Sequence, residues 1–155
     1  MKIRVPSFTL GELYEEVEQL VAPGITRAYM SGEKDYLERH CGEAAFSAVS
    51  ASIKERERLR LTLDDTILQE PQDIVLARAM LMDSEAPVFV FTYNTQQINC
   101  LMDETGEVIE GAEDDIRTVQ YAIAIQRHPE ADEATDLEYP WMVHELAIVG
   151  NQPTI

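Results

Sequence analysis

The chain has 155 residues, of which 45% are hydrophobic and 26% are charged, proportions that are ordinary for one globular domain. They exclude a collagen, a coiled coil and a fully disordered chain. The unusual quantity is the net charge of −17, from 12 basic and 29 acidic residues. Such a chain is repelled on average by nucleic acid and by anionic lipid. Direct nucleic-acid binding is therefore not expected, and contact with anionic lipid needs a local basic patch.

The first part of the chain is typical of helices. Ser7 and Thr9 are both candidate N-caps of the first helix, and Glu12, three residues after Thr9, fits a capping box. Apolar residues at three- and four-residue steps continue to Val21, and Pro23-Gly24 is expected to end or kink the helix. Further helices are predicted over Ile25–Met30, Glu33–Cys41 and Glu43–Arg58.

The second part of the chain is typical of an antiparallel sheet. Glu70-Pro71 predicts a break, residues 83–87 a turn, and Asp103 to Gly106 a hairpin turn with Gly106 at positive φ. Gly111 predicts another turn, and residues 128–139 an acidic loop. Strands are predicted over residues 59–63, 73–82, 88–102, 108–109, 116–127 and 141–149.

Helices followed by a meander of strands predict an α+β fold with the helices packed on one face of the sheet. We expect residues 1–155 to form one domain, with a helical part over about residues 8–58 and a sheet part over about residues 59–150. Charge is divided unequally between these parts. Residues 1–60 carry nine basic and ten acidic side chains, whereas residues 61–155 carry three arginines and 19 acidic side chains. A neutral helical side and an acidic sheet side would suit different neighbours, although solubility explains the charge equally well.

Four short stretches carry a resemblance to a known family. They are Ala28-Tyr-Met-Ser-Gly with Leu37, Cys41, Glu43 and Ala44; Ala86-Pro87-Val88; Thr95-Gln-Gln-Ile-Asn-Cys with Asp103, Gly106, Glu110 and Gly111; and Tyr139-Pro-Trp141 with Glu145-Leu146, Gly150 and Gln152. In this order they resemble the C-terminal domain of the forty-four-kilodalton subunit of the mitochondrial presequence translocase, and the plant and algal members look nearest. The chain departs from the family at three positions, where it has Met102, Ile123 and Met142 in place of Arg, Trp and Arg.

The resemblance implies a cone-shaped domain similar to nuclear transport factor two, in which a curved antiparallel sheet wraps around helices and leaves an apolar pocket. The expected lining of this pocket is Tyr93, Tyr121, Ile123 and Trp141. In the family the domain lies on the matrix face of the inner membrane, against cardiolipin-rich lipid and the translocase channel. A separate N-terminal region there tethers the matrix chaperone. Without that region, the chain is expected to be a processed or truncated domain or a one-domain relative.

Little in the sequence points to catalysis or to a metal. His40, His128 and His144 lack the close spacing of metal ligands, Cys41 and Cys100 are expected to be reduced thiols, and no nucleophile or phosphate-binding motif occurs. We therefore expect no metal, no cofactor and no enzymatic activity. One enzymatic alternative remains, because related cones host dehydratases and isomerases that use an acid–base pair. Its candidate residues are Tyr93, Asp103, His144 and Glu145.

The basic cluster of the sequence comprises Lys54, Arg56, Arg58 and Arg60. It is a candidate contact for lipid headgroups or an acidic partner, and pairing between neighbouring turns of a solvated helix is the plainer explanation. The polar face of the first helix is acidic, whereas membrane-surface helices usually have basic polar faces. This helix is therefore expected to pack on the core or on a partner.

These observations predict a non-enzymatic adaptor or scaffold domain at the matrix face of the mitochondrial inner membrane, with protein partners in an import complex. Its acidic sheet is expected to attract basic presequences or basic loops of the channel. The first alternative is a related structural subunit of another mitochondrial assembly, namely the mitoribosomal large subunit, a respiratory complex or ATP synthase. The second alternative is a cone that binds a small molecule or acts as an enzyme.

Overall fold

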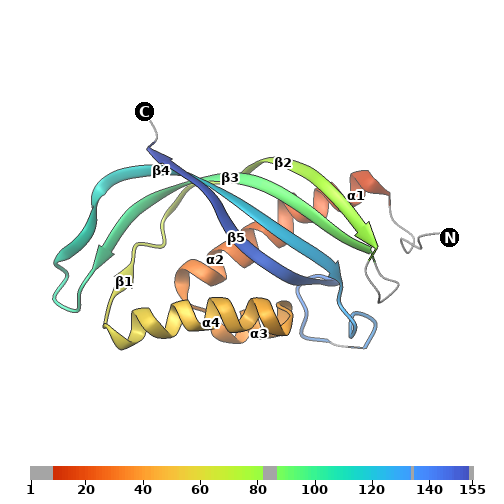
Figure 1. Cartoon of the computed structure of the whole chain (residues 1–155), viewed down its shortest axis with the longest axis horizontal. Coiled ribbons are helices and arrows are strands. Elements are labelled where there is room, and N and C mark those ends of the chain that lie inside the picture. The colour runs from red at the N-terminus through yellow and green to blue at the C-terminus, as the bar shows by residue number, and fades with distance from the viewer. Residues whose placement is uncertain (1–8, 82–86, 134, 154–155) are drawn as a thin grey trace.

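Four α-helices lie along one side of an antiparallel sheet that curls over them, as Figure 1 shows. The computed structural model describes residues 9–81, 87–133 and 135–153, so most of the turn predicted over residues 83–87 lies outside the described residues. The predicted α+β cone is confirmed. Its elements are α1 (Leu10–Glu16), η1 (Val17–Val21), α2 (Ala22–Ser31), α3 (Lys34–His40), α4 (Glu43–Arg58), β1 (Thr62–Leu63), β2 (Ile67–Leu81), β3 (Pro87–Met102), β4 (Val108–Arg127) and β5 (Trp141–Pro153).

The first helical segment begins as predicted but does not end where it was expected to. Thr9 is the N-cap, and its side-chain oxygen accepts a hydrogen bond from the Glu12 N–H at 3.2 Å. Pro23 does not break the helix, because η1 is a wider π-helical turn immediately before it and α2 continues directly. Gly24 serves packing, since a Cβ there would overlap the Tyr36 hydroxyl. The segment ends at Gly32, whose φ is 73°.

The sheet is built on β3. Both β1 and β2 pair with one edge of β3, β4 pairs with its other edge, and β5 completes the sheet beside β4. The strand predicted over residues 59–63 is mostly wrong, because only Thr62–Leu63 is a strand. Leu59 and Leu61 donate backbone hydrogen bonds to the carbonyls of Glu55 and Arg56. The alternating leucines therefore finish the last turn of α4.

Two further predicted interruptions are bulges inside long strands. β2 runs through Pro71 with register shifts on either side, and Asp73 takes a φ of 57° there. β4 runs through Gly111, so the predicted turn is wrong and the two strands expected on either side of it are one. In both strands the irregular residue adds chain length locally without ending the pairing. The hairpin turn with Gly106 at a φ of 85° is confirmed.

The core lies between the helices and the inner, concave face of the sheet. Trp141 is 2% exposed and its ring meets Phe89 edge to face at 6.1 Å, which confirms that it packs on the concave side. Helix residues that recur at three- and four-residue steps cover these rings. The largest fully buried side chains are Trp141, Tyr93, Tyr121, Phe91, Leu13, Ile25, Leu37, Ile123, Ile125, His40, Val17 and Val21.

His40 is fully buried beneath the loop that joins β4 to β5. Its ring lies 4.5 Å from that of Tyr36 and 4.3 Å from that of Tyr139, and the Tyr36 hydroxyl donates to the Tyr139 hydroxyl at 2.8 Å. The His40 Nε2 accepts a hydrogen bond from the Glu138 N–H at 3.2 Å, so the ring is neutral with its proton on Nδ1. Burial, and then the positive charge of Arg39, lower the pKa of His40 to about 4.

The domain is therefore expected to lose stability as the pH falls. A histidine with a pKa near 6.5 when unfolded and about 4 when folded stabilises the fold fully above pH 6.5. By pH 4.5 the loss should reach about 2–3 kcal/mol, measurable by urea unfolding at a series of pH values. His40→Gln is the matched variant, because it keeps an acceptor but does not titrate. If its stability falls as steeply between pH 6.5 and 4.5 as that of the unchanged chain, His40 is not the cause.

Candidate functional site

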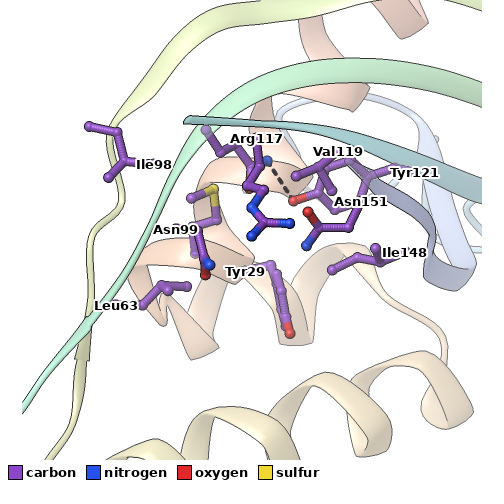
Figure 2. Close-up of a pocket in the computed structure, with 11 residues that line it drawn as sticks. Tyr29, Leu63, Ile98, Asn99, Arg117, Val119, Tyr121, Ile148 and Asn151 are labelled. Carbon is purple, nitrogen blue, oxygen red and sulfur yellow. Dashed lines mark hydrogen bonds between the residues drawn. The ribbon is translucent and has the colours of Figure 1, made fainter. Parts of the chain in front are cut away.

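A pocket opens between the end of α2 and the part of the concave sheet face that the helices leave uncovered (Figure 2). Its cavity is about 140 Å³, and an adjoining hollow of about 180 Å³ extends over α4. Tyr29, Tyr121 and Ile148 border both spaces, and we call the two adjoining spaces together the groove. The pocket is lined by Tyr29, Met30, Leu63, Gln97, Ile98, Asn99, Arg117, Val119, Tyr121, Ile148 and Asn151.

The inner face of the sheet changes from apolar to polar along its strands. Alternate residues of a strand face the same side, so the inner side of β3 runs from Phe91 through Thr95 and Gln97 to Asn99. The helices cover the aromatic end, and the pocket lies over the amide-rich end. The groove can therefore hold a ligand or peptide segment that is apolar on one side and hydrogen-bonding on the other.

Buried hydrogen bonds fix the floor of the pocket. Gln97 is 8% exposed, and its amide donates to the Tyr121 hydroxyl at 2.6 Å and to the Thr95 hydroxyl at 2.7 Å. Figure 2 shows the bond to Tyr121 as a dashed line. Burial raises the pKa of Tyr121 to about 12, so its phenol is neutral at physiological pH. These neutral groups, each with a fixed partner, hold the floor of the pocket in shape.

Arg117, in the polar wall of the pocket, is paired with Asp115, which lies behind that wall and does not line the pocket. The Asp115 carboxylate accepts hydrogen bonds from the Asn99 amide at 2.9 Å and from the Arg117 guanidinium at 3.1 Å. The Asn99 bond, and then Arg117, lower the pKa of Asp115. The position of Asp115 is set by a bulge in β4 that begins at Gly111. Cys100 pairs with Gly111 and Ile98 with Ile116, so residues 112–115 all lie opposite the single residue Asn99. The Gly111 Cα abuts the Asn99 carbonyl, where only glycine fits.

A known protein family matches nearly the whole chain, including most of the residues that line the pocket. Residues 1–148 match the Tim44-like domain family, which is nearly the whole chain. The chain belongs to this family. The stretches Ala28-Tyr-Met-Ser-Gly and Thr95-Gln-Gln-Ile-Asn-Cys therefore supply Tyr29, Gln97 and Asn99 to the pocket of a Tim44-like domain, and Leu146 of the last stretch borders the adjoining hollow.

Curated relatives carry the names of import proteins. The chain is 29% identical over 156 residues to the mitochondrial import inner membrane translocase subunit TIM44-1 of Arabidopsis thaliana, covering 100% of this chain and 32% of that protein. It is 29% identical to TIM44 of Homo sapiens over 79% of this chain and 26% of that protein. For TIM44 of Saccharomyces cerevisiae the identity is 26%, over 97% and 35%. The chain thus spans about a third or less of the length of these relatives.

Solved structures share the fold at low sequence identity. The intermembrane space region of the chloroplast protein ARC6 aligns with a TM-score of 0.56 and 11% identity, over 96% of this chain and 100% of that one. A periplasmic fragment of TraM aligns with a TM-score of 0.53 and 13% identity, over 95% and 99%. At such identities the likeness shows the fold alone, and it supports the cone-shaped α+β architecture of the Tim44-like domain.

The expected pocket lining is only partly at the groove. Tyr121 lines it, whereas Tyr93, Ile123 and Trp141 lie deeper in the core of the Tim44-like domain, with exposures of 0%, 0% and 2%. The Tyr93 hydroxyl is hydrogen-bonded to that of Thr26 at 2.7 Å. Sequence reasoning missed Tyr29, Gln97, Asn99 and Arg117 as lining residues. The first three stand within stretches that carry the family resemblance, which was the available signal.

The enzymatic alternative placed an acid–base pair in the pocket, and its four candidates lie apart. Tyr93 is in the core, and Asp103 is in the hairpin turn, where its carboxylate accepts the Thr105 hydroxyl at 2.6 Å. His144 is hydrogen-bonded to Gln126, which lies on the outer face of the sheet. Glu145 is exposed opposite Ala124 on the same outer face. None of the four borders the groove.

Three members of the basic cluster have partners, two of them in other parts of the domain and one on the same helix. Arg56 donates to the carbonyl oxygens of Tyr29 at 2.9 Å and Met30 at 3.0 Å, and its guanidinium lies 5.7 Å from the Tyr29 ring centre. Arg58 pairs with Glu55, and Arg60 pairs with Glu104 in the β3–β4 hairpin. Lys54 is exposed on α4. Arg56 is therefore a residue that holds Tyr29 in the pocket wall.

The sheet was predicted to have one acidic side. In the structure the acidic residues gather instead at the two ends of the sheet. The hairpin end gathers Asp64, Asp65, Glu104, Glu107, Glu110, Glu113 and Asp114, and the loop between β4 and β5 gathers Glu130, Asp132, Glu133, Asp136 and Glu138. The outer face between them is nearly uncharged. The physical reason is that turns and strand ends are solvated on all sides, whereas residues in mid-strand have neighbours on both sides.

The described residues hold neither a group of metal-ligating side chains nor a helix of membrane-spanning length and apolarity. Within residues 9–81, 87–133 and 135–153, no three His, Cys, Asp or Glu side chains are grouped so that they could hold a metal ion. Across the same residues, no helix is both long and apolar enough to span a bilayer.

Proposed function

We propose that this Tim44-like domain is a non-enzymatic adaptor or scaffold of mitochondrial protein import, at the matrix face of the inner membrane. The match to the family over residues 1–148 carries the proposal. Relatives in a plant, a mammal and a yeast are all named as import translocase subunits of the inner membrane. In addition, three of the four stretches that carry the resemblance contribute residues to the groove.

The groove favours binding over catalysis. The acid beside it, Asp115, does not line it, has a lowered pKa and is paired with Arg117, which makes it a poor proton donor or acceptor near neutral pH. Its phenol, Tyr121, has a raised pKa. An amide-rich wall opposite apolar residues such as Val119 suits the backbone and side chains of a peptide segment. The two acidic ends add attraction for basic presequences or basic loops of the channel.

Site-specific photo-crosslinking from the groove in intact mitochondria tests this function. A photoreactive residue replaces Ile148, which is 51% exposed and borders the groove, and in a second chain it replaces Val149. Val149 is 55% exposed but does not border the groove, so it is a matched control. We expect Ile148 to cross-link to subunits of the import translocase and Val149 not to do so.

Other products identify the alternatives. If Ile148 cross-links instead to ribosomal, respiratory-chain or ATP-synthase subunits, the domain belongs to another mitochondrial assembly and the import proposal is wrong. A small molecule retained in the groove of the purified domain, with no protein cross-link from Ile148, would favour the ligand-binding cone.

Contact with anionic lipid through the basic cluster is a separate proposal. We expect the domain to sediment with vesicles that contain anionic phospholipid and to be released as salt rises, since exposed charges are screened within about 8 Å at physiological ionic strength. Replacing Lys54, Arg58 and Arg60 with glutamine should weaken sedimentation. Arg56 stays unchanged because it holds Tyr29. Salt-insensitive sedimentation of the triple variant would point instead to insertion of apolar residues.

A further inference from the structure

The pocket has a hollow at each end. The hollow over α4 meets it where Ile148 borders both, and a third hollow, of about 240 Å³, shares Met30 and Leu63 with it. Figure 2 shows Leu63 and Ile148 on opposite sides of the pocket. The groove and the third hollow therefore form a row of three spaces along the concave face of the sheet.

Four neighbouring strands each place a side chain along this row. Leu63 lies on β1, Asn99 on β3, Arg117 on β4 and Asn151 on β5, and these strands are adjacent in that order. All four residues line the pocket, and Figure 2 shows the three polar ones in the same order across it. β1 and β5 are three strand spacings apart, roughly 14 Å, which is the length of about four residues of extended peptide.

The three polar side chains can pair with a peptide main chain. The Asp115 carboxylate accepts hydrogen bonds from the Asn99 amide nitrogen and from the Arg117 guanidinium, which holds both side chains in place. The Asn99 oxygen can then accept a hydrogen bond from a ligand, Arg117 can donate one, and the exposed Asn151 amide can do both. Each residue of an extended peptide, except proline, offers one N–H and one carbonyl oxygen to such groups.

The two ends of the row differ in charge. Every described residue that lines the hollow over α4 is uncharged. The third hollow is bordered by Asp65, a member of the acidic hairpin end, and Asp64 adjoins it in the chain. Of the other charged residues there, Arg56 donates to backbone carbonyls and Glu57 is paired with Lys34. A complementary ligand is therefore apolar at the α4 end and positively charged at the hairpin end.

We propose that the groove and the third hollow bind an extended segment of a partner protein that carries a basic residue and, about three residues away, an apolar residue. Its main chain pairs with Asn99, Arg117 and Asn151, and its basic side chain meets Asp65. Its apolar side chain fills the hollow over α4, of about 180 Å³, since an apolar cavity of about 150 Å³ already holds a benzene-sized group. The proposal rests on the role proposed above for the groove as a binding site for proteins, and it adds the chemistry that is recognised.

Titration of the chain with synthetic peptides, followed by nuclear magnetic resonance, tests this occupant. The probe is a peptide blocked at both ends, with one lysine and, three residues later, one leucine among glycines and serines. We expect it to shift the side-chain amide signals of Asn99 and Asn151. Methylation of the main-chain nitrogens between its lysine and leucine should raise the dissociation constant about tenfold, and methylation outside that stretch should not. Glutamine in place of the lysine should raise it about threefold.

Three variants test the contacts one by one, each against a control. Asn151→Ala should weaken binding of the probe about tenfold, whereas Gln152→Ala, on the outer face of the same strand, should not. Ala48→Phe fills the hollow over α4 and should weaken binding about tenfold, whereas Ala51→Phe, exposed on the same helix, should not. Asp65→Asn should weaken binding of the lysine peptide but not of the glutamine peptide. Equal melting temperatures will show that each variant is folded.

Several results would overturn the proposal. Equal affinity for the probe and for the peptide methylated between lysine and leucine would mean that the main chain is not recognised. Equal losses in Ala48→Phe and Ala51→Phe would mean that the apolar side chain lies elsewhere. If octanoate shifts the groove signals and the probe does not, the groove takes apolar small molecules. If the probe fails to bind while Ile148 still cross-links to translocase subunits in mitochondria, the adaptor role stands and the extended segment is wrong.

Discussion

Trp141→Ala is expected to lower the free energy of unfolding by about 3–5 kcal/mol, the usual cost of truncating a buried tryptophan. Trp141 is 2% exposed and its ring packs against Phe89, so the shortened side chain leaves a cavity that the surrounding sheet cannot close. Domains are stable by only about 5–15 kcal/mol. The variant should therefore be largely unfolded or insoluble at 37 °C.

Two measurements check this expectation. Trp141 is the single tryptophan of the chain, so the fluorescence of the folded domain should be blue-shifted and poorly quenched by acrylamide. Leu59→Ala is the control, because Leu59 is 48% exposed and its truncation should cost no more than about 0.5 kcal/mol. A red, readily quenched emission together with a stable Trp141→Ala variant would show that the ring is an exposed anchor.

The parts of the fold that could be predicted are those that local chemistry decides. Thr9 caps its helix with its own side chain, and Gly106 allows the tight hairpin turn, so both act within a few residues of sequence. The run of β-forming residues from Val88 predicts β3 because β-propensity is high there. Helices followed by strands then leave few arrangements other than α+β.

Three of the wrong predictions share a physical cause. Pro71, Pro23 and Gly111 were read as interruptions, since proline lacks an N–H and glycine favours positive φ. In the structure long-range pairing and packing continue through all three, and the chain accommodates them as bulges or as the π-helical turn η1. A local signal reveals that the backbone is irregular at a residue. It does not reveal whether the element stops there.

The groove could be predicted only in part for a similar reason. Alternation along β4 gives the inner face, to which both Tyr121 and Ile123 belong, but not the point at which the helices cease to cover it. That point depends on α2 ending at Gly32 and on Arg56 holding the last turn over the sheet. Both features depend on tertiary packing, which the local sequence does not reveal. They decide that Tyr121 lines the pocket whereas Ile123 is buried in the core.

Gly111→Ala is expected to destabilise the domain by about 3–5 kcal/mol, although it adds a single methyl group. Gly111 has a φ of 75°, where any other residue costs about 1–2 kcal/mol. The new Cβ would also overlap the Asn99 carbonyl oxygen and lie 2.8 Å from its carbon, so the backbone of β3 must move. Movement of Asn99, which lines the pocket, disturbs its hydrogen bond to Asp115.

Gly106→Ala separates the two causes. Gly106 has a φ of 85°, but a Cβ there has nothing within 4 Å, so only the cost of positive φ applies, about 1–2 kcal/mol. Urea unfolding of both variants should show a clearly larger loss for Gly111→Ala, and each lost kcal/mol should lower the melting temperature by about 2–4 °C. If both variants lose the same free energy of unfolding, the backbone of β3 at Asn99 moves aside at little cost. The bulge that places Asp115 would then be a flexible part of the pocket, not a fixed one.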